Sequence, residues 1–325
     1  MKNPIPLKYR IFKKYNGCVP NKKDSRDITL GDIVMAGVYT PDPNAPTWEV
    51  GFDNEIKYGK LKREHQGGSS SCVGQGWSKY AEMLNLIEEK HADDLSAKDI
   101  YSQIFLPDWG AYLRDGAKVI VNSGVCEEKL ISSYLADGSP PNEEFMRQRP
   151  SPLPAGYEEN RKTYKSLKYV SLLVSDPMTD ADWENARQII WQYGGFTSGY
   201  SGHCMYAVGY GLVDGKRSIK FINSYGENND RDYIQGEPNR LYDITFLVDL
   251  PNPPSKINML KIIGDRGSGR QYVKGIDNKL CWIFNEALLN DLGSAGVIDK
   301  FTVDWQDNLD GMEISDPWAI IKTKN

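Results

Sequence analysis

Cysteine and histidine are scarce in this chain, with five cysteines and three histidines among 325 residues. The cysteines are odd in number and far apart, which excludes a disulfide scaffold, and none belongs to a CxxC pair of the kind that binds metals. We therefore expect no metal ion, no cofactor, and free thiols in a reducing compartment. The cysteines are Cys18, Cys72, Cys126, Cys204 and Cys281.

The sequence also lacks long apolar runs and blocks of positive charge. No stretch approaches the ~20 apolar residues that would span a bilayer, and the net charge of −5 favours neither nucleic acid nor an anionic membrane as a partner. The first residues, MKNPIPLKYRIFKKYNGC, are basic but have no apolar core and no small-residue cleavage site. We therefore expect no signal peptide, and a cytoplasmic or particle-associated protein rather than a classically secreted one.

Composition shifts divide the chain into three parts. Residues 1–46 are rich in Pro, Asn, Asp and Lys, which predicts an extended N-terminal arm or a pro-segment. Residues 47–250 carry the periodic segments and end at the Pro-rich stretch LPNPPSK. Residues 251–325 suffice for a small C-terminal α/β module with a hairpin, a short helix and another strand, whose role the sequence does not indicate.

Helical patterns precede strand patterns within residues 47–250. A helix is predicted directly after three serines, because Val73, Trp77 and Tyr80 recur at helical spacing. Further helices are predicted for LSAKDIYSQIF, DGAKVIVNSG and DADWENARQIIWQY, and short strands for GGFTSGY, CMYAVGYGLV, RSIKFINSYG and YDITFLVDL. VDGK, between two of these strands, predicts a hairpin turn. Helices first and strands second are typical of an α+β protein.

The segment HQGGSSSCVGQGWS, residues 65–78, places a cysteine where a helix should begin. A helix dipole favours negative charge at that end, so the pKa of the Cys72 thiol is predicted to be lowered. Gln66, six residues upstream, can supply an N–H donor to an oxyanion, with the backbone N–H of Cys72 as a second donor. The small residues between them let a substrate approach the backbone, and Ser70 or Ser71 can cap the helix.

A thiol nucleophile needs a base, and the three histidines are the candidates. His65 lies in a loop, His91 lies at a charged helix end, and His203 begins the apolar strand HCMYAVGYG. His203 is the best candidate, and Asn223, at the end of the next strand, can accept the other imidazole N–H and orient the ring. Cys204 is expected to be a core thiol that points away from the cleft, because neighbouring side chains of a strand alternate between faces.

Together these residues resemble the papain-like cysteine peptidases, in their bacterial and viral branch. The matching elements are Gln66, the cysteine six residues later, HCMYAVGYG and NSYG, and the resemblance covers roughly residues 50–250. It implies a two-lobed fold: a helical left lobe whose central helix begins at the cysteine, an antiparallel β-rich right lobe, and an active cleft between them. It also implies roles in the cleavage of a polypeptide substrate, namely Cys72 as nucleophile, His203 as base, Asn223 as the orienting residue and Gln66 as the oxyanion donor.

The chain departs from the family pattern in its substrate-binding parts. Tyr225 replaces a tryptophan and is expected to shield the Asn–His hydrogen bond, and a loop before His203 is missing. The helical lobe shows no Gly-Gly stretch that would bind an extended substrate backbone. Substrate contacts are expected at Gly67, Gly68, Ser71, Gly202 and Tyr225.

We predict a cysteine endopeptidase that acts as a monomer, and two alternatives stay open. One is a peptidoglycan amidase or endopeptidase on the same fold, with the C-terminal module as a wall binder. The other is a catalytically inactive homologue with a structural or binding role. The complete set of thiol, imidazole, amide and oxyanion donor favours the peptidase. The region before residue 47 is expected to cover part of the helical lobe or the cleft, as a permanent arm or as a removable pro-segment.

Overall fold

The computed structural model describes the chain in ranges separated by short gaps. The described residues are 17–24, 27–35, 39–108, 110–172, 174–175, 177–227, 233–235, 241–248 and five strands between 260 and 315. The chain separates into two compact units, Met1–Thr29 with Pro41–Asp249, and Leu30–Thr40 with Leu250–Asn325. The predicted boundaries at residues 46 and 250 remain a prediction.

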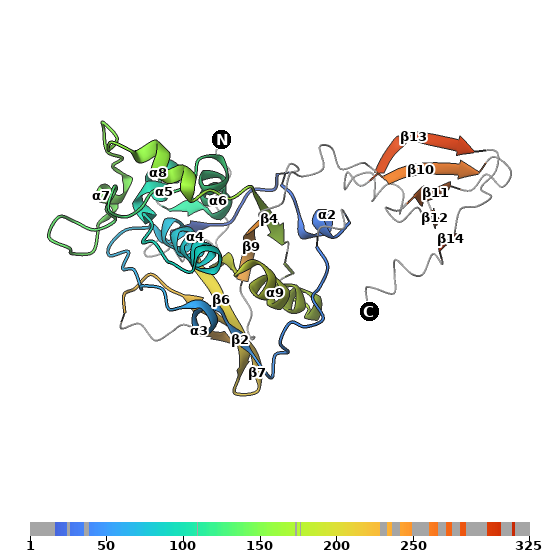
Figure 1. Ribbon diagram of the computed structural model, residues 1–325, viewed down its shortest axis with the longest axis horizontal. Coiled ribbons are helices and arrows are strands. Elements are labelled where there is room, and N and C mark those ends of the chain that lie inside the picture. Colours follow the sequence, from blue (N-terminus) through green and yellow to red (C-terminus); the bar gives the residue numbers. More distant parts are fainter. Residues whose placement is uncertain are drawn as a thin grey trace. The chain divides into compact units, whose positions relative to one another are not determined.

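Helices of the first unit begin and end at recognisable sequence signals. They are α3 (Asn54–Tyr58), α4 (Cys72–Glu89), α5 (Ala97–Ile104), α6 (Leu113–Asn122), α7 (Glu143–Arg147), α8 (Tyr157–Thr163) and α9 (Asp180–Tyr193) (Figure 1). Ser96 accepts the N–H of Asp99 at the start of α5, and Thr179 forms a capping box with Asp182 in α9. Gly124, with φ +80°, follows the end of α6. Within the described ranges, no helix combines the length and the apolar character needed to cross a bilayer.

The strands of the first unit form an antiparallel sheet in the order β4-β9-β5-β6-β7-β8, with β2 paired to β6. Their bounds are β2 (Phe52–Asp53), β4 (Lys168–Leu172), β5 (Phe196–Tyr200), β6 (His203–Val213), β7 (Lys216–Ile222), β8 (Tyr233–Gln235) and β9 (Leu241–Val248). Asp214 and Gly215 both have positive φ and make the predicted tight turn between β6 and β7. A helical part and an antiparallel sheet confirm the predicted α+β class.

The second unit contains α2 (Leu30–Met35) and a mixed sheet in the order β13-β10-β11-β12-β14. The strands of this sheet are β10 (Leu260–Asp265), β11 (Gln271–Lys274), β12 (Leu280–Ile283), β13 (Ile298–Gln306) and β14 (Ile314–Ser315). Strands β10, β11 and β12 pair antiparallel in sequence order, whereas β13 and β14 pair in parallel with β10 and β12. The short helix predicted for this part lies outside the described residues.

Helix α4 is buried on all sides over residues 72–83. Figure 1 shows it between α5 and β6, and it contacts both. Trp77 is fully buried, as its spacing predicts, and its Nε1 donates to the backbone oxygen of Leu113 at 2.8 Å. Glu82 is buried as well, although it carries a carboxyl group. Because packing surrounds the helix, the cysteine at its start is held in one place.

A buried cation balances the acidic groups around α4. Lys79 Nζ lies 2.7 Å from Glu82 Oε2 and 3.2 Å from Glu64 Oε1, and these side chains are at most 5% exposed. Burial alone lowers the pKa of Lys79, but the carboxylates of Glu82 and Glu64 outweigh it and raise the pKa above the ordinary value. The ammonium therefore stays charged, and its loss would leave Glu82 without a cation and Glu64 with only the half-exposed Lys62.

We expect Lys79→Met to lower the free energy of unfolding by ~3–5 kcal/mol, the usual cost of breaking a buried ion pair from one side. The matched control is Lys118→Met, because Lys118 lies on α6 in a half-exposed pair with Asp115. That pair should contribute less than ~1 kcal/mol. Urea unfolding of both variants measures the difference, and equal losses would contradict the role given to Lys79.

Candidate active site

A turn of serines holds Cys72 at the start of α4. Ser71 is the N-cap residue, but its side chain makes no capping hydrogen bond, so the predicted serine cap does not form. Its Oγ instead pairs with Ser69 Oγ at 2.7 Å. The N–H of Ser70 donates to Glu143 Oε2 at 2.6 Å. A carboxylate from α7 therefore holds the backbone directly before the N-cap residue of α4.

The structure brings the predicted thiol, imidazole and amide together from three elements. Sγ of Cys72 accepts the backbone N–H of Cys204 at 3.3 Å, and Cys204 follows His203 at the start of β6. His203 Nε2 lies 2.8 Å from Oδ1 of Asn223, which directly follows β7. The same Oδ1 accepts the N–H of Ser224 at 2.8 Å, which keeps the amide oxygen directed at the ring.

The imidazole of His203 is buried and held in one tautomer. Because Oδ1 of Asn223 accepts the Nε2–H, Nδ1 carries the lone pair, and it has no hydrogen-bond partner among the described residues. Tyr225 stacks on the ring with centroids 4.8 Å and planes 12° apart. Burial lowers the pKa of His203 and the hydrogen bond to Asn223 raises it, with a net downward shift. The ring is therefore neutral at pH 7, with one free basic nitrogen.

Gln66 is buried in the neighbouring loop with its side chain fixed at both ends. Its Nε2 donates to the carbonyl of Ser69 at 2.9 Å, and its Oε1 accepts the hydroxyl of Ser224 at 2.5 Å. The backbone N–H of Gln66 also donates to the carbonyl of Ser224 at 2.9 Å. These bonds use one of the two Nε2 hydrogens and leave the second for another acceptor.

Residues 17–24 and 27–29, called the arm below, cover the candidate nucleophile. The backbone N–H of Gly17 donates to Sγ of Cys72. The N–H of Cys18 donates to the carbonyl of Gly202 at 2.8 Å, and the carbonyl of Gly17 accepts the N–H of Ala111 at 2.7 Å. Strand β1 (Cys18–Val19) thereby pairs in parallel with β3 (Ala111–Tyr112). The arm thus lies between the sheet end that carries His203 and the edge that precedes α6.

Polar contacts hold the arm further along. Asn21 donates its N–H to Asp243 Oδ2 at 2.6 Å and accepts the N–H of Arg114 at 3.0 Å. The guanidinium of Arg114 pairs with Asp27, which also accepts the hydroxyl of Tyr169 at 3.0 Å. The arm is therefore fastened to the helical part and to the sheet of the first unit.

Under the arm, Cys72 is fully buried, and this burial raises the pKa of its thiol well above the usual range. The nearby Cys18 raises it further, whereas the N–H groups of Cys204, Gly17 and Val73 lower it. The lowered pKa predicted from the helix dipole is therefore wrong for this arrangement. The loss of hydration destabilises the thiolate more than the helix dipole and the N–H groups stabilise it. With the arm in place, both the thiol and the imidazole are neutral.

Cys204 lies on the far side of β6 from His203, as strand alternation requires. That side, however, is where α4 and the arm lie. Its Sγ is 2.9 Å from the position that a Cβ on Gly76 of α4 would take, and burial together with the neighbouring Cys18 raises the pKa of its thiol. Cys204 is a buried thiol, as predicted, and one of its neighbours is a cysteine of the arm.

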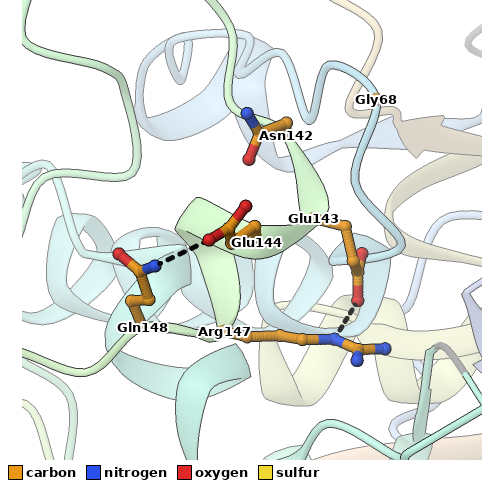
Figure 2. Close-up of a pocket in the computed structure, with 6 residues that line it drawn as sticks. All are labelled: Gly68, Asn142, Glu143, Glu144, Arg147 and Gln148. Atoms are coloured by element: carbon orange, nitrogen blue, oxygen red, sulfur yellow. Dashed lines mark hydrogen bonds and ion pairs between the residues drawn. The ribbon is translucent and has the colours of Figure 1, made fainter.

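An open hollow of about 550 Å³ lies beside the turn that precedes Cys72. Figure 2 shows the residues that line it: Gly68, Asn142, Glu143, Glu144, Arg147 and Gln148. Arg147 Nε lies 2.6 Å from Glu143 Oε1, so this cation is already paired. A Cβ added at Gly68 would meet no atom within 4 Å. The hollow is therefore open next to one of the predicted substrate contacts.

The other predicted substrate contacts have different surroundings. Gly67 has φ +58°, and a Cβ there would lie 2.2 Å from the carbonyl oxygen of Pro141, so the backbone path requires glycine. Ser71 is fully buried, whereas Tyr225 is 39% exposed. Gly202 uses its carbonyl to hold the arm. Contact of these residues with a substrate remains a prediction.

The sequence did not reveal that the backbone of Gly110 and Ala111 binds the arm. No Gly-Gly stretch was expected from the helical lobe, yet Gly110 and Ala111 form a small-residue edge directly before α6. A Cβ on Gly110 would lie 2.3 Å from the carbonyl oxygen of Gly17, so the two backbones are in close contact. The available signal was the pair of small residues a few positions before the predicted helix DGAKVIVNSG.

Comparisons with known proteins support the fold. No family model and no curated protein matches the chain. Among solved structures it is similar to xylellain, a cysteine protease from Xylella fastidiosa, with TM-score 0.54, 18% identity, and coverage of 73% of this chain and 97% of that one. It is also similar to digestive procathepsin L2 from Tenebrio molitor larval midgut, with TM-score 0.51, 14% identity, and coverage of 75% and 80%. The predicted papain-like fold is thereby confirmed.

We expect Gly17→Val to unseat the arm, because a Cβ at residue 17 would lie 2.0 Å from the backbone oxygen of Ser70. A steric cost of ~1–3 kcal/mol would make alkylation of Cys72 by iodoacetamide roughly 5–100 times faster at pH 7. Mass spectrometry of the tryptic peptide 64–79 follows the reaction. The control is Lys23→Ala, an exposed change on the same arm; equal rates in both variants would show that the arm does not protect the thiol.

Proposed function

We propose that this chain is a cysteine endopeptidase that hydrolyses peptide bonds through Cys72, His203 and Asn223, with Gln66 as an oxyanion donor. The observation that carries the proposal is the convergence at the start of α4. There Sγ of Cys72 accepts the backbone N–H of the residue after His203, Nδ1 of His203 has no hydrogen-bond partner among the described residues, and the amide oxygen of Asn223 orients the ring. This is the arrangement that a thiol nucleophile and its base require.

The reaction begins when Nδ1 of His203 takes the proton of Cys72. The thiolate attacks the substrate carbonyl, and the imidazolium then gives the proton to the leaving amine. Oδ1 of Asn223 accepts the Nε2–H throughout, so the ring keeps the tautomer that leaves Nδ1 basic. The stacked Tyr225 covers one face of the ring. Water then hydrolyses the thioester by the same proton transfers in reverse.

Charge on the tetrahedral intermediate needs donors that are in place before it forms. The free Nε2–H of Gln66 is one candidate, and its amide cannot rotate easily because Ser69 and Ser224 hold its two ends. The backbone N–H of Cys72, at the positive end of α4, is the second candidate.

Binding of an extended polypeptide is supported by the groups that hold the arm. The carbonyl of Gly202 and the N–H of Ala111 bind the backbone of Gly17 and Cys18, not their side chains. A substrate backbone could use the same groups, so arm and substrate would compete for one site. Turnover therefore requires that the arm leave the cleft, by displacement or by cleavage.

We expect Cys72→Ala and His203→Ala each to abolish turnover of a peptide substrate, measured on protein with the Gly17→Val change so that the arm does not mask the result. The thiol and its base act as a unit, so the double variant should be scarcely slower than either single variant.

Cys126→Ala is the matched control, because Cys126 is a buried thiol in a separate core cluster with Ile131 and Tyr157. It should keep its activity. A casein substrate and purified peptidoglycan should be compared in the same assay. Retained activity in His203→Ala, or cleavage of peptidoglycan alone, would contradict the proposal.

We expect Gln66→Ala to lower kcat by roughly 10²–10³, the usual effect of removing one oxyanion donor. Asn223→Ala should lower kcat less than His203→Ala, because the ring can still sample its productive orientation. Thermal melts of both variants separate lost catalysis from lost folding. An unchanged kcat in Gln66→Ala at unchanged stability would restrict Gln66 to a structural role.

A further inference from the structure

Three thiols meet at the start of α4, and only one of them has a part in the proposed reaction. Cys18, Cys72 and Cys204 are 3%, 0% and 1% exposed. They come from the arm, from α4 and from β6, so they are far apart in sequence and close only in the folded unit. Among the described residues, no group of three or more Cys, His, Asp or Glu side chains has the geometry to hold a metal ion. The cluster therefore needs another explanation.

Two of the three thiols are neighbours. Burial raises the pKa of the Cys204 thiol, and the side chain of Cys18 contributes to the raised pKa. Sγ of Cys72 instead accepts backbone N–H groups, including that of Cys204 at 3.3 Å. Sγ of Cys204 has its position because α4 carries glycine at residue 76, where a Cβ would come within 2.9 Å of the sulfur. Cys18 and Cys204 are therefore the candidate pair for a disulfide.

The backbone of Cys18 is fixed on both sides of the arm. Its N–H donates to the carbonyl of Gly202 at 2.8 Å, and its carbonyl accepts the hydroxyl of Tyr242 at 3.1 Å. Strand pairing with Ala111 holds it from the helical part. A disulfide forms without backbone movement only when the two Cβ atoms are already close and the chain holds them there. Cys18 is bonded to Gly202 and Tyr242, and Tyr242 and Cys204 both pair with Gly199 of β5, so the seated arm keeps the two cysteines in one neighbourhood.

We infer that Cys18 and Cys204 are a redox modification site, at which a peroxide forms a disulfide that locks the arm over Cys72. The peroxide oxidises the Cys18 thiol to a sulfenic acid with release of water or alcohol, when the arm lifts and exposes it. After the arm reseats, the Cys204 thiol attacks the sulfenic sulfur and a second water leaves. Two thiols lose two electrons and two protons, and the peroxide O–O bond is reduced.

A small dithiol reverses the lock by thiol–disulfide exchange. Its thiolate attacks the disulfide between Cys18 and Cys204, the two protein thiols are restored, and the dithiol is oxidised to its own disulfide. The effect on turnover rests on the proposed peptidase function, whereas formation of the disulfide does not. The lock would keep the enzyme latent under oxidising conditions and would also keep Cys72 away from the oxidant.

The test uses the full chain with Cys72→Ala, so that the nucleophile cannot take part. After treatment with hydrogen peroxide, free thiols are blocked with N-ethylmaleimide in denaturant and the protein is digested with trypsin without reductant. We expect peptide 15–22, which contains Cys18, joined to peptide 188–216, which contains Cys204, at a mass two hydrogens below their sum. Adding Cys126→Ser should leave the linked peptide unchanged, and adding Cys18→Ser or Cys204→Ser should remove it.

No linked peptide, or a link from Cys18 to any other cysteine, would overturn the inference. Turnover of protein with the native Cys72 separates this outcome from failure of the proposed function. A peroxide-treated sample should lose turnover and recover it with dithiothreitol. If the linked peptide forms but Gly17→Val protein cleaves no substrate, the lock stands and the peptidase proposal fails. If Gly17→Val protein is active and no linked peptide forms, the peptidase proposal stands and the lock fails.

Discussion

One hydrogen bond joins the helical part to the sheet at the candidate site: the backbone N–H of Cys204 donates to Sγ of Cys72 at 3.3 Å. It connects the first residue of α4 to the start of β6, and His203 is the residue before the donor. The bond holds because both elements are buried there and neither can shift alone. The thiol and the imidazole are thus positioned by the fold as a whole rather than by the loops around them.

The candidate oxyanion donor is likewise held by contacts between separate segments of the chain. The side chain of Gln66 ends on the hydroxyl of Ser224, the residue after Asn223. The loop before α4 and the loop after β7 are therefore joined, and a movement of one moves the other. A buried amide with both ends bonded keeps its donor in place without reorganisation, which is what stabilisation of a developing charge requires.

The arm changes the chemistry of the site as well as access to it. A helix dipole favours a thiolate by roughly 0.3–1 kcal/mol, whereas removing a charge from water costs several kcal/mol. Burial of Cys72 under Gly17 and Cys18 therefore outweighs the dipole, and the pKa of the thiol is raised rather than lowered. The same arm brings a second thiol, that of Cys18, next to Cys204. The raised pKa of Cys72 and the thiol cluster thus have one structural origin.

The sequence by itself determined the fold class and the candidates for the chemistry. Helical spacing at Trp77 and Tyr80, the short apolar runs of the later strands and the turn at Asp214 are local patterns, so they were predictable without a structure. Only the tertiary structure decided that the arm covers the thiol, that Cys18 and Cys204 are neighbours, and that the pKa of Cys72 is raised. These depend on contacts between residues far apart in the sequence and on the exclusion of water, and a local pattern contains neither.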